Sequence, residues 1–273
     1  MGRVFEQKAL PFIMKSTEKD INMTARTLIV PITAVHAQPP ALSPLDARLE
    51  AAVPFVRGGV VADVGTDHAY LPISLLRRGL CSFAVATDIH RGPAEVAAAH
   101  LGANGIGEER ARVLLTDGLR GAEQFSPTDI CIFGMGGEMI AHIIDEAPWV
   151  KDSAVRLILQ PMTRMEHLRD YLDSHGFAIR EECLVKTDRI YQILCAEFDG
   201  QTRTHTPLEQ QLGARNMQRR DALCIELAQR LQTTLTQSRA GKLMGASPDT
   251  SREDALLAEL DAFLLNQTED TTL

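Results

Sequence analysis

Short apolar runs alternate with amphipathic segments between Leu45 and Phe198. The runs are rich in valine, isoleucine and leucine and have the length of buried strands, whereas the segments between them repeat apolar positions with a helical period. The predicted strands are Val60–Val64, Phe83–Thr87, Arg112–Thr116, Ile130–Phe133, Val155–Gln160, Ala178–Val185 and Tyr191–Phe198. The predicted helices are His68–Arg78, Pro93–Gly102, Gly118–Gln124, Glu138–Glu146 and Arg164–Ser174.

The alternation predicts an α/β fold. Continuously apolar strands separated by helices are typical of a parallel sheet that is covered on both faces. Only the residues KTDR at 186–189 separate the last two strands, so these should form an antiparallel hairpin. Parallel units that end in such a hairpin are the layout of class I methyltransferases. We therefore predict a Rossmann-like methyltransferase sheet, mostly parallel with its last strand antiparallel, over residues 42–200.

The C-terminal part, residues 201–273, has a helical pattern. It follows DGQTRTHTP at 199–207, which has the composition of a linker. Leucines recur every four residues from Leu223 to Leu235, and after GKLMGASPDTS the apolar period resumes from Leu256 to Leu264. This pattern predicts two helices that pack as an antiparallel hairpin or short coiled coil.

Residues 1–41 do not fit either pattern. Their apolar stretch is short and is broken by Pro31, and small residues follow at Val35-His36-Ala37. A signal peptide has a similar order of features, but the internal proline argues against one. We expect a poorly ordered extension, or a start codon upstream of the natural one at Met14 or Met23.

Charge and cysteine content narrow the class of protein. A net charge of −8 over 273 residues argues against broad nonspecific binding of nucleic acid, although residues 203–242 hold seven basic and three acidic side chains. No apolar run reaches the roughly 20 residues of a membrane span. The five cysteines form no CxxC pair, which favours free thiols in a reducing cytoplasm.

The turn after the first strand differs from a phosphate-binding turn. In ADVGTDHAY, Asp63 ends the strand and Gly65 follows, but Asp67 stands where a dinucleotide fingerprint has its second glycine. A carboxylate there would repel a pyrophosphate. It would attract S-adenosylmethionine, which carries a sulfonium and an ammonium and no phosphate.

Each residue of this turn also has a structural interpretation. Asp67 could cap the helix from His68, contact the ligand, or do both. For Asp63 a ligand role is favoured, because an unpaired carboxylate at the end of an apolar strand is costly. His68 is better explained as a packed helix residue.

Two further acids follow the next strands. Asp88 closes the second strand at the distance expected of a carboxylate that holds ribose hydroxyls, with a helix cap as its alternative. Asp117 follows the third strand and is equally well explained as an adenine contact or as a turn residue before glycine. Acids that close three successive strands indicate an adenosyl ligand.

The fourth strand leads into GMGG, Gly134 to Gly137, where glycines would let a flat base approach or would form a tight turn. The Asn/Asp-Pro-Pro-aromatic motif of enzymes that methylate exocyclic amines is absent, which argues against that chemistry.

The chain resembles the bacterial tRNA (adenine-N1)-methyltransferases that act on adenine 22. The resemblance covers Leu45 to Phe198 and rests on LDARLEAAVPFV, ADVGTDHAYLPI, TDGL, GMGGEMIAHI, RLILQPM, LRDYLDSHGF and YQILCAEF in this order. Met162 departs from the pattern, since asparagine is frequent after LILQP. The resemblance implies that the S-adenosylmethionine site is lined by Asp63, Gly65, Asp67, His68, Asp88, Ile89, Asp117, Gly118, Gly134, Met135, Gly136 and Gly137, with no metal.

The resemblance also implies tRNA as partner. Adenine N1 has an in-plane lone pair, so catalysis should be mainly positioning, with Asp67 or Gln160 as candidate acceptors of the proton that the product loses. Gln160 is better explained as a cap of its strand. Arg215, Arg219 and Arg220 are the candidate RNA contacts. The alternatives are a noncatalytic RNA-binding protein on a methyltransferase fold and a methyltransferase of another substrate.

Overall fold

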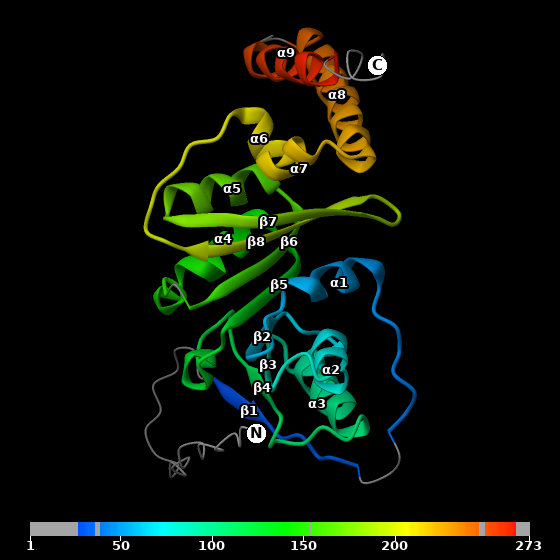
Figure 1. Cartoon of the computed structure of the whole chain (residues 1–273), viewed down its shortest axis with the longest axis vertical. Helices are drawn as coiled ribbons and strands as arrows, with labels where there is room; N and C mark the ends of the chain where they lie inside the picture. Colours follow the sequence, from blue (N-terminus) through cyan, green and yellow to red (C-terminus); the bar gives the residue numbers. More distant parts are fainter. Residues whose placement is uncertain (1–26, 36–38, 153, 246–248, 266–273) are drawn as a thin grey trace, which may run out of the picture.

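A computed structural model of the chain describes residues 27–35, 39–152, 154–245 and 249–265 (Figure 1). The strands are β1 (Leu28–Val30), β2 (Val60–Val64), β3 (Phe83–Asp88), β4 (Ala111–Leu115), β5 (Asp129–Gly136), β6 (Arg156–Thr163), β7 (Phe177–Lys186) and β8 (Ile190–Phe198). The helices are α1 (Ala47–Ala52), α2 (Tyr70–Arg77), α3 (Arg91–Ala103), α4 (Gly137–Asp145), α5 (Met165–Ser174), α6 (Pro207–Leu212), α7 (Ala214–Arg219), α8 (Ala222–Leu243) and α9 (Ser251–Leu265).

The strands form one mixed sheet in the order β1-β4-β3-β2-β5-β6-β8-β7. Strands β4, β3, β2, β5 and β6 are parallel, and β8 is antiparallel to both of its neighbours. The chain builds outward from β2 to β4 and then returns to place β5 on the other side of β2. The strand order therefore reverses between β2 and β5, and ligands of open α/β sheets bind at the carboxyl ends of strands at such a point.

Two layers of helices cover the sheet (Figure 1). Side chains alternate between the faces, so Val61 packs with α2 and α3, whereas Ala62 and Val64 pack with α4. Helix α1 adds Ala52 to the first of these cores, and α5 adds buried leucines to the second. The predicted fold class is confirmed, and each predicted strand is present with ends that differ by at most a few residues.

The predicted helix at 118–124 is wrong. Only a 3₁₀ helix, Ala122–Phe125, forms there. Gly118 and Gly121 both have left-handed backbone angles, with φ of +56° and +82°, and an α-helix cannot pass through such residues. Two glycines three positions apart were therefore a stronger signal than the apolar spacing around them.

The N-terminal extension is partly ordered, contrary to expectation. Strand β1 pairs antiparallel with β4 at the edge of the sheet, and the Thr27 hydroxyl lies 3.0 Å from that of Thr116. The Val35 N–H donates to the Gly102 carbonyl of α3 at 3.0 Å. The expectation of disorder for residues 1–26 and the candidate cleavage site at Ala37 lie outside the described residues.

The C-terminal helices form a separate small core above the sheet (Figure 1). Helix α6 begins with a capping box between Thr206 and Glu209, and α8 and α9 pack against each other and against α6. The core holds the predicted leucines except Leu223 and Leu257; Ala228 is its fully buried residue on α8. Among the described helices, none combines the length and apolar character that a membrane span requires.

The segment that joins the two parts is fixed to the sheet domain. Arg203 pairs with Asp199 at 2.5 Å, and its backbone N–H donates to the Asp173 carbonyl at 2.9 Å. His205 Nδ1 lies 2.6 Å from the Asp173 carboxylate. The linker predicted from composition is therefore an ordered connection.

Candidate active site

The turn after β2 lies at the reversal point of the sheet and is bound to the end of β3. The N–H groups of Gly65 and Thr66 both donate to the Thr87 carbonyl, at 2.8 and 3.1 Å. Gly65 has φ of +69°, which favours glycine, and a Cβ there would displace the end of the Met135 side chain of β5. The turn thus joins β2, β3 and β5 around one point.

Asp63 ends β2 beneath this turn and is almost fully buried, with 6% of its surface exposed. Burial raises the pKa of its carboxyl to about 6; the hydrogen bond from the Thr66 hydroxyl, at 2.6 Å, opposes this, and the nearby Asp88 carboxylate adds to it. A buried acid with a pKa close to neutrality gains from a cationic ligand, because the ligand replaces the missing countercharge.

Asp67 does not cap α2, so that interpretation is wrong. The residue has a left-handed backbone with φ of +50°, the helix begins at Tyr70 after Ala69, and no side chain caps it. The Asp67 side chain is 68% exposed and points to solvent beside His68, whose Nε2 lies 3.5 Å away. The structure leaves the Asp67 carboxylate available at the rim of the site.

His68 is not a helix residue, and it packs outside α2 rather than within it. Its ring stacks on Tyr70 at 5.3 Å and on His100 of α3 at 5.4 Å between centroids. Its Nδ1 atom is buried and has no hydrogen-bond partner in the described part of the chain. His68 therefore packs against other side chains as predicted, but it lies in the turn before α2 and is not part of that helix.

Asp88 closes β3 beside Asp63. Its Oδ1 accepts the His90 N–H at 2.8 Å, but His90 is itself the N-cap of α3 and no side chain caps that helix, so the alternative capping role is wrong. No hydrogen bond within the described residues reaches Oδ2. Ile89 follows with 57% of its surface exposed, which gives an apolar surface next to a free carboxylate oxygen. A nucleoside needs both, for its ribose and its base.

Asp117 and Gly118 lie after β4, near the same edge. The Thr87 hydroxyl donates to the Gly118 carbonyl at 2.8 Å and so joins this turn to the end of β3. Both residues line a cavity of about 170 Å³ that continues toward His142 and Glu146 of α4. Asp117 is exposed, and its carbonyl accepts the Arg120 N–H at 3.3 Å within the turn.

The GMGG segment is part of β5 rather than a free turn. The strand continues to Gly136 with irregular pairing around Met135, and α4 begins directly at Gly137. A Cβ on Gly137 would collide with the Arg164 carbonyl, so glycine is required where α4 and α5 approach. The Met135 side chain lies over Gly65 and so borders the turn after β2.

Gln160 is fully buried and its carboxamide is already engaged. Its Oε1 accepts Arg48 Nη1 at 2.7 Å and the Gly134 N–H at 3.3 Å, and its Nε2 donates to the Pro161 carbonyl at 2.7 Å. Both lone pairs of Oε1 are therefore engaged, as expected of a residue that caps its strand, and the proton-acceptor role stays a prediction.

Arg48 of α1 is a site residue to which sequence analysis gave no role. It lies against Gly134, since a Cβ built there would be 3.5 Å from its Nη1. The only signal in the sequence is its place in LDARLEAAVPFV, a segment that matches the family. Contact with Gln160, 112 residues away, could not be read from a local pattern.

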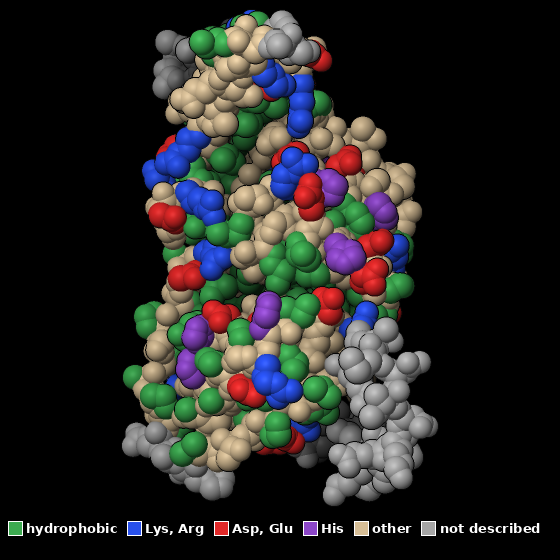
Figure 2. All heavy atoms as spheres, turned by 180° about the vertical axis from the view of Figure 1, so that it is seen from behind, with side chains coloured by type: hydrophobic (Ala, Val, Ile, Leu, Met, Phe, Trp, Pro, Cys, Tyr) green, Lys and Arg blue, Asp and Glu red, His purple; other side chains and the backbone are tan. Residues whose placement is uncertain are grey.

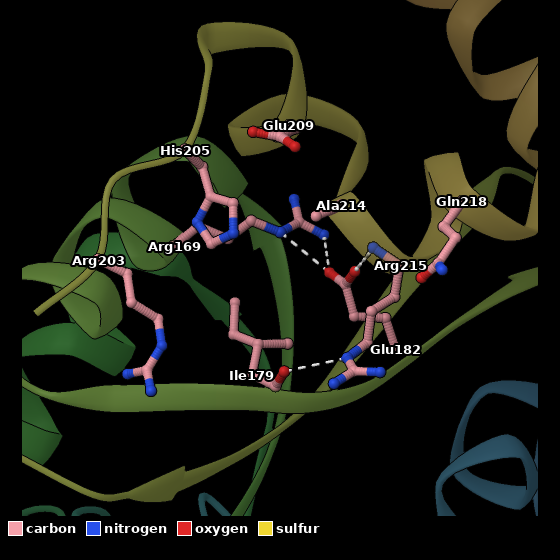
Figure 3. Close-up of a pocket in the computed structure, with 9 residues that line it drawn as sticks. All are labelled: Arg169, Ile179, Glu182, Arg203, His205, Glu209, Ala214, Arg215 and Gln218. Carbon is pink, nitrogen blue, oxygen red and sulfur yellow. Dashed lines mark hydrogen bonds and ion pairs between the residues drawn. The ribbon is translucent and has the colours of Figure 1, made fainter. Parts of the chain in front are cut away.

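A second cavity, of about 300 Å³, lies between β7, the linker and α7 (Figure 3). Arg169 of α5 pairs there with Glu182 of β7 at 2.7 Å, and 2% and 1% of these side chains are exposed. Glu182 also accepts the Arg215 N–H at 3.0 Å, and Arg169 donates to the Gln210 carbonyl at 2.8 Å. This buried ion pair fastens α6 and α7 to the sheet.

The three arginines of the predicted RNA contact differ in their surroundings. Arg215 is exposed, although its Nε donates to the Ile179 carbonyl at 3.1 Å. Arg219 is exposed and bonded to Asn216, whereas Arg220 turns back onto α9, where it stacks on Phe263 at 4.5 Å and donates to its carbonyl. Figure 2 shows basic side chains along one edge beneath the C-terminal helices, with acidic ones among them.

A sheet of this order, with buried acids closing β2 and β3 around a glycine turn, defines a class I methyltransferase. A model of the family described as methyltransferase domain matches residues 45–194, more than half of the chain. The chain belongs to this family.

The names of individual relatives specify a narrower activity than the family description does. The chain is 34% identical over 155 residues to the tRNA (adenine(22)-N(1))-methyltransferase of Bacillus subtilis; the match spans 56% of this chain and 65% of that protein's length. A Streptococcus pneumoniae structure assigned to tRNA (m1A22) methylation is 30% identical, with a TM-score of 0.72 over 81% of this chain and all of that one. Its complex with S-adenosyl-L-methionine has a TM-score of 0.70, at 29% identity and the same coverage of both chains.

Proposed function

We propose that the protein transfers a methyl group from S-adenosylmethionine to N1 of adenine 22 in tRNA. The observation that carries this proposal is the pair of buried acids, Asp63 and Asp88, at the reversal point of a sheet that is similar to one crystallised with this cofactor. The names of the relatives supply the substrate class.

The residues present fit this cofactor. Asp63 supplies negative charge below the site, the free Oδ2 of Asp88 suits ribose hydroxyls, and Ile89 suits the adenine face. The proposed lining also includes Gly65, Asp67, His68, Asp117, Gly118 and Gly134–Gly137. S-adenosylmethionine supplies an electrophilic methyl group on a sulfonium, and the protein positions the acceptor against it.

Positioning is the main task of the protein in the reaction. The lone pair of adenine N1 forms the new bond to the methyl carbon as the carbon–sulfur bond breaks, so the nucleophile needs no base. The product base is cationic and neutral again only after loss of a proton from its amino group. Asp67, exposed at the rim, is the proposed acceptor; Gln160 holds Arg48 and Gly134 in place instead.

We further propose that residues 201–273 form a tRNA-binding domain. Adenine 22 must be extruded from a folded tRNA, at a cost of a few kcal/mol, and contacts to the rest of the molecule have to supply that energy. Arg215 and Arg219 are exposed and would contact RNA phosphates. Arg220 stacks on Phe263 and would act by holding α9 in position. All five cysteines are free, four of them buried, which fits a cytoplasmic protein.

The experiment adds labelled S-adenosylmethionine to unmodified tRNA and to the same tRNA with guanine in place of adenine 22. Transfer to the first RNA alone supports the proposal. Binding of both RNAs without transfer, under conditions where the cofactor binds, would instead identify a noncatalytic RNA-binding protein. Transfer to a protein or a small molecule but not to tRNA would also contradict it.

The first prediction concerns the ribose contact. Asp88→Ala should weaken S-adenosylmethionine binding about tenfold or more, since a hydrogen bond to a charged group contributes about 1.5–3 kcal/mol. The measurement is titration calorimetry, with circular dichroism to show that the fold is intact. Glu108→Ala is the control, because this exposed acid precedes β4 at the opposite edge of the sheet. Unchanged affinity of Asp88→Ala would remove this residue from the site.

A further inference from the structure

Two arginines and a tyrosine converge at the carboxyl end of β6, next to the candidate active site. The guanidinium carbons of Arg48 and Arg189 lie 5.6 and 4.8 Å from the centre of the Tyr191 ring. Both guanidinium groups also reach the Met162 sulfur, Arg48 Nη1 at 3.9 Å and Arg189 Nη2 at 3.3 Å. We call Arg48, Met162, Arg189 and Tyr191 the arginine–tyrosine cluster.

The cluster adjoins the place where the methyl group is transferred. Arg48 Nη1 shares the Gln160 oxygen with the Gly134 N–H, and the Met135 side chain that follows Gly134 covers Gly65. A chain of contacts through Gln160, Gly134 and Met135 therefore connects the cluster to the glycine turn. Helix α1 packs against β7 and β8, which brings Arg48 to the β7–β8 hairpin (Figure 1).

The guanidinium groups of this cluster have unused hydrogen-bond capacity. A guanidinium has five N–H donors, and a thioether sulfur is a weak acceptor. Within the described residues, the one hydrogen bond of the Arg189 side chain goes to the Met162 sulfur, and no carboxylate lies within ion-pair distance. Arg48 adds a strong bond only to Gln160, while its contact with Asp46 is 3.4 Å long.

The neighbouring acid does not neutralise Arg189. Asp188 accepts hydrogen bonds from the Thr187 hydroxyl at 2.7 Å and from the Tyr191 hydroxyl at 3.0 Å. These bonds lower the pKa of Asp188 and hold the Tyr191 ring in position. The carboxylate is thus used to orient the ring, and the guanidinium beside it stays available to a ligand.

Planar guanidinium groups with free donors bind phosphate oxygens in pairs, and an aromatic face accepts a base. The cluster therefore has the chemistry of a nucleotide site with a phosphate on its solvent side. From there Lys186 and Arg230, joined through Glu226, continue toward α8. This direction agrees with the basic side chains along one edge in Figure 2.

We propose that Arg48 and Arg189 bind the RNA phosphate next to the methylated adenosine, so that RNA lies across the surface where α1 meets the β7–β8 hairpin. The inference rests on the proposed function and names the part of the surface that takes the reacting nucleotide. Met162 has a role in this proposal. Its sulfur is a weak acceptor that holds both guanidinium groups near each other and leaves most of their N–H donors free for a phosphate.

The test compares Arg189→Ala with Arg180→Ala, an exposed arginine at the other end of the same hairpin. For Arg189→Ala we expect the KM for tRNA to rise about tenfold, kcat to stay within about twofold, and the slope of log affinity against log salt to fall by about one. Arg180→Ala should leave all three unchanged. Arg189→Lys should restore part of the affinity, because it keeps the charge but loses the paired geometry.

Two results would overturn the inference while the proposed function stands. One is a wild-type-like KM and salt slope in Arg189→Ala; the other is a fall in kcat alone. If the wild type transfers no methyl group to tRNA, the proposed function fails. The salt dependence of tRNA binding by wild type and Arg189→Ala then still decides whether the cluster holds a phosphate.

Discussion

Replacing Arg169 by methionine should lower the free energy of unfolding by about 3–5 kcal/mol. The change leaves Glu182 buried without its countercharge, and removal of one partner of a buried ion pair has costs of this size. The bonds from Arg169 to the Gln210 carbonyl and to Gln192 are lost as well. Urea unfolding followed by circular dichroism measures the effect.

The matched control is Arg203→Met, which breaks an ion pair at the surface of the same cavity. Its partner Asp199 is only partly buried and also pairs with Arg180 at 3.1 Å, so the loss should stay below about 1 kcal/mol. A second variant, Arg169→Met with Glu182→Leu, should recover most of the stability, because no buried charge remains. Equal losses in Arg169→Met and Arg203→Met would contradict the anchoring role of the buried pair.

Replacing Asp63 by asparagine should stabilise the ligand-free protein and weaken cofactor binding. The pKa of Asp63 is raised from 3.8 to about 6 in the folded state. The contribution of this group to stability is therefore fully present below about pH 3.8 and is lost as the pH rises through about 6. At about pH 7.5 the ionised carboxylate costs about 3 kcal/mol, which asparagine removes.

Ionisation of Asp63 lowers the stability of the ligand-free protein, but it should raise the affinity for the cofactor. A cationic ligand binds the ionised carboxylate, so wild-type affinity should decline as the pH falls through about 6, whereas Asp63→Asn should bind at least tenfold more weakly with a flatter profile. Calorimetry at several pH values, with thermal unfolding, measures both. A variant that is less stable and binds normally would refute the role of Asp63.

Much of the site follows from the sequence because strand ends are easy to locate. Asp63 and Asp88 end continuous apolar runs, and parallel strands bring their carboxyl ends to one edge. The antiparallel pairing of β7 and β8 follows from the short KTDR connection, which is long enough only for a hairpin.

What could not be predicted depends on backbone angles and on long-range contacts. Asp67 failed as a cap because it and Ala69 adopt left-handed angles that no propensity indicates for alanine. The Gln160 side chain is hydrogen-bonded by Arg48, and the position of Arg48 depends on how α1 packs against the β7–β8 hairpin. Strand β1 is three residues long and gains its order from β4, so a local pattern could not show it.

The central claim is methyl transfer to N1 of adenine 22, and the most direct measurement is reverse transcription of tRNA treated with the protein and S-adenosylmethionine. A methyl group on N1 blocks the base-pairing edge, so the account predicts a cofactor-dependent stop at position 22, which disappears when that adenine is replaced by guanine. Methyl transfer to the tRNA without a stop, or a stop at another adenine, would contradict it.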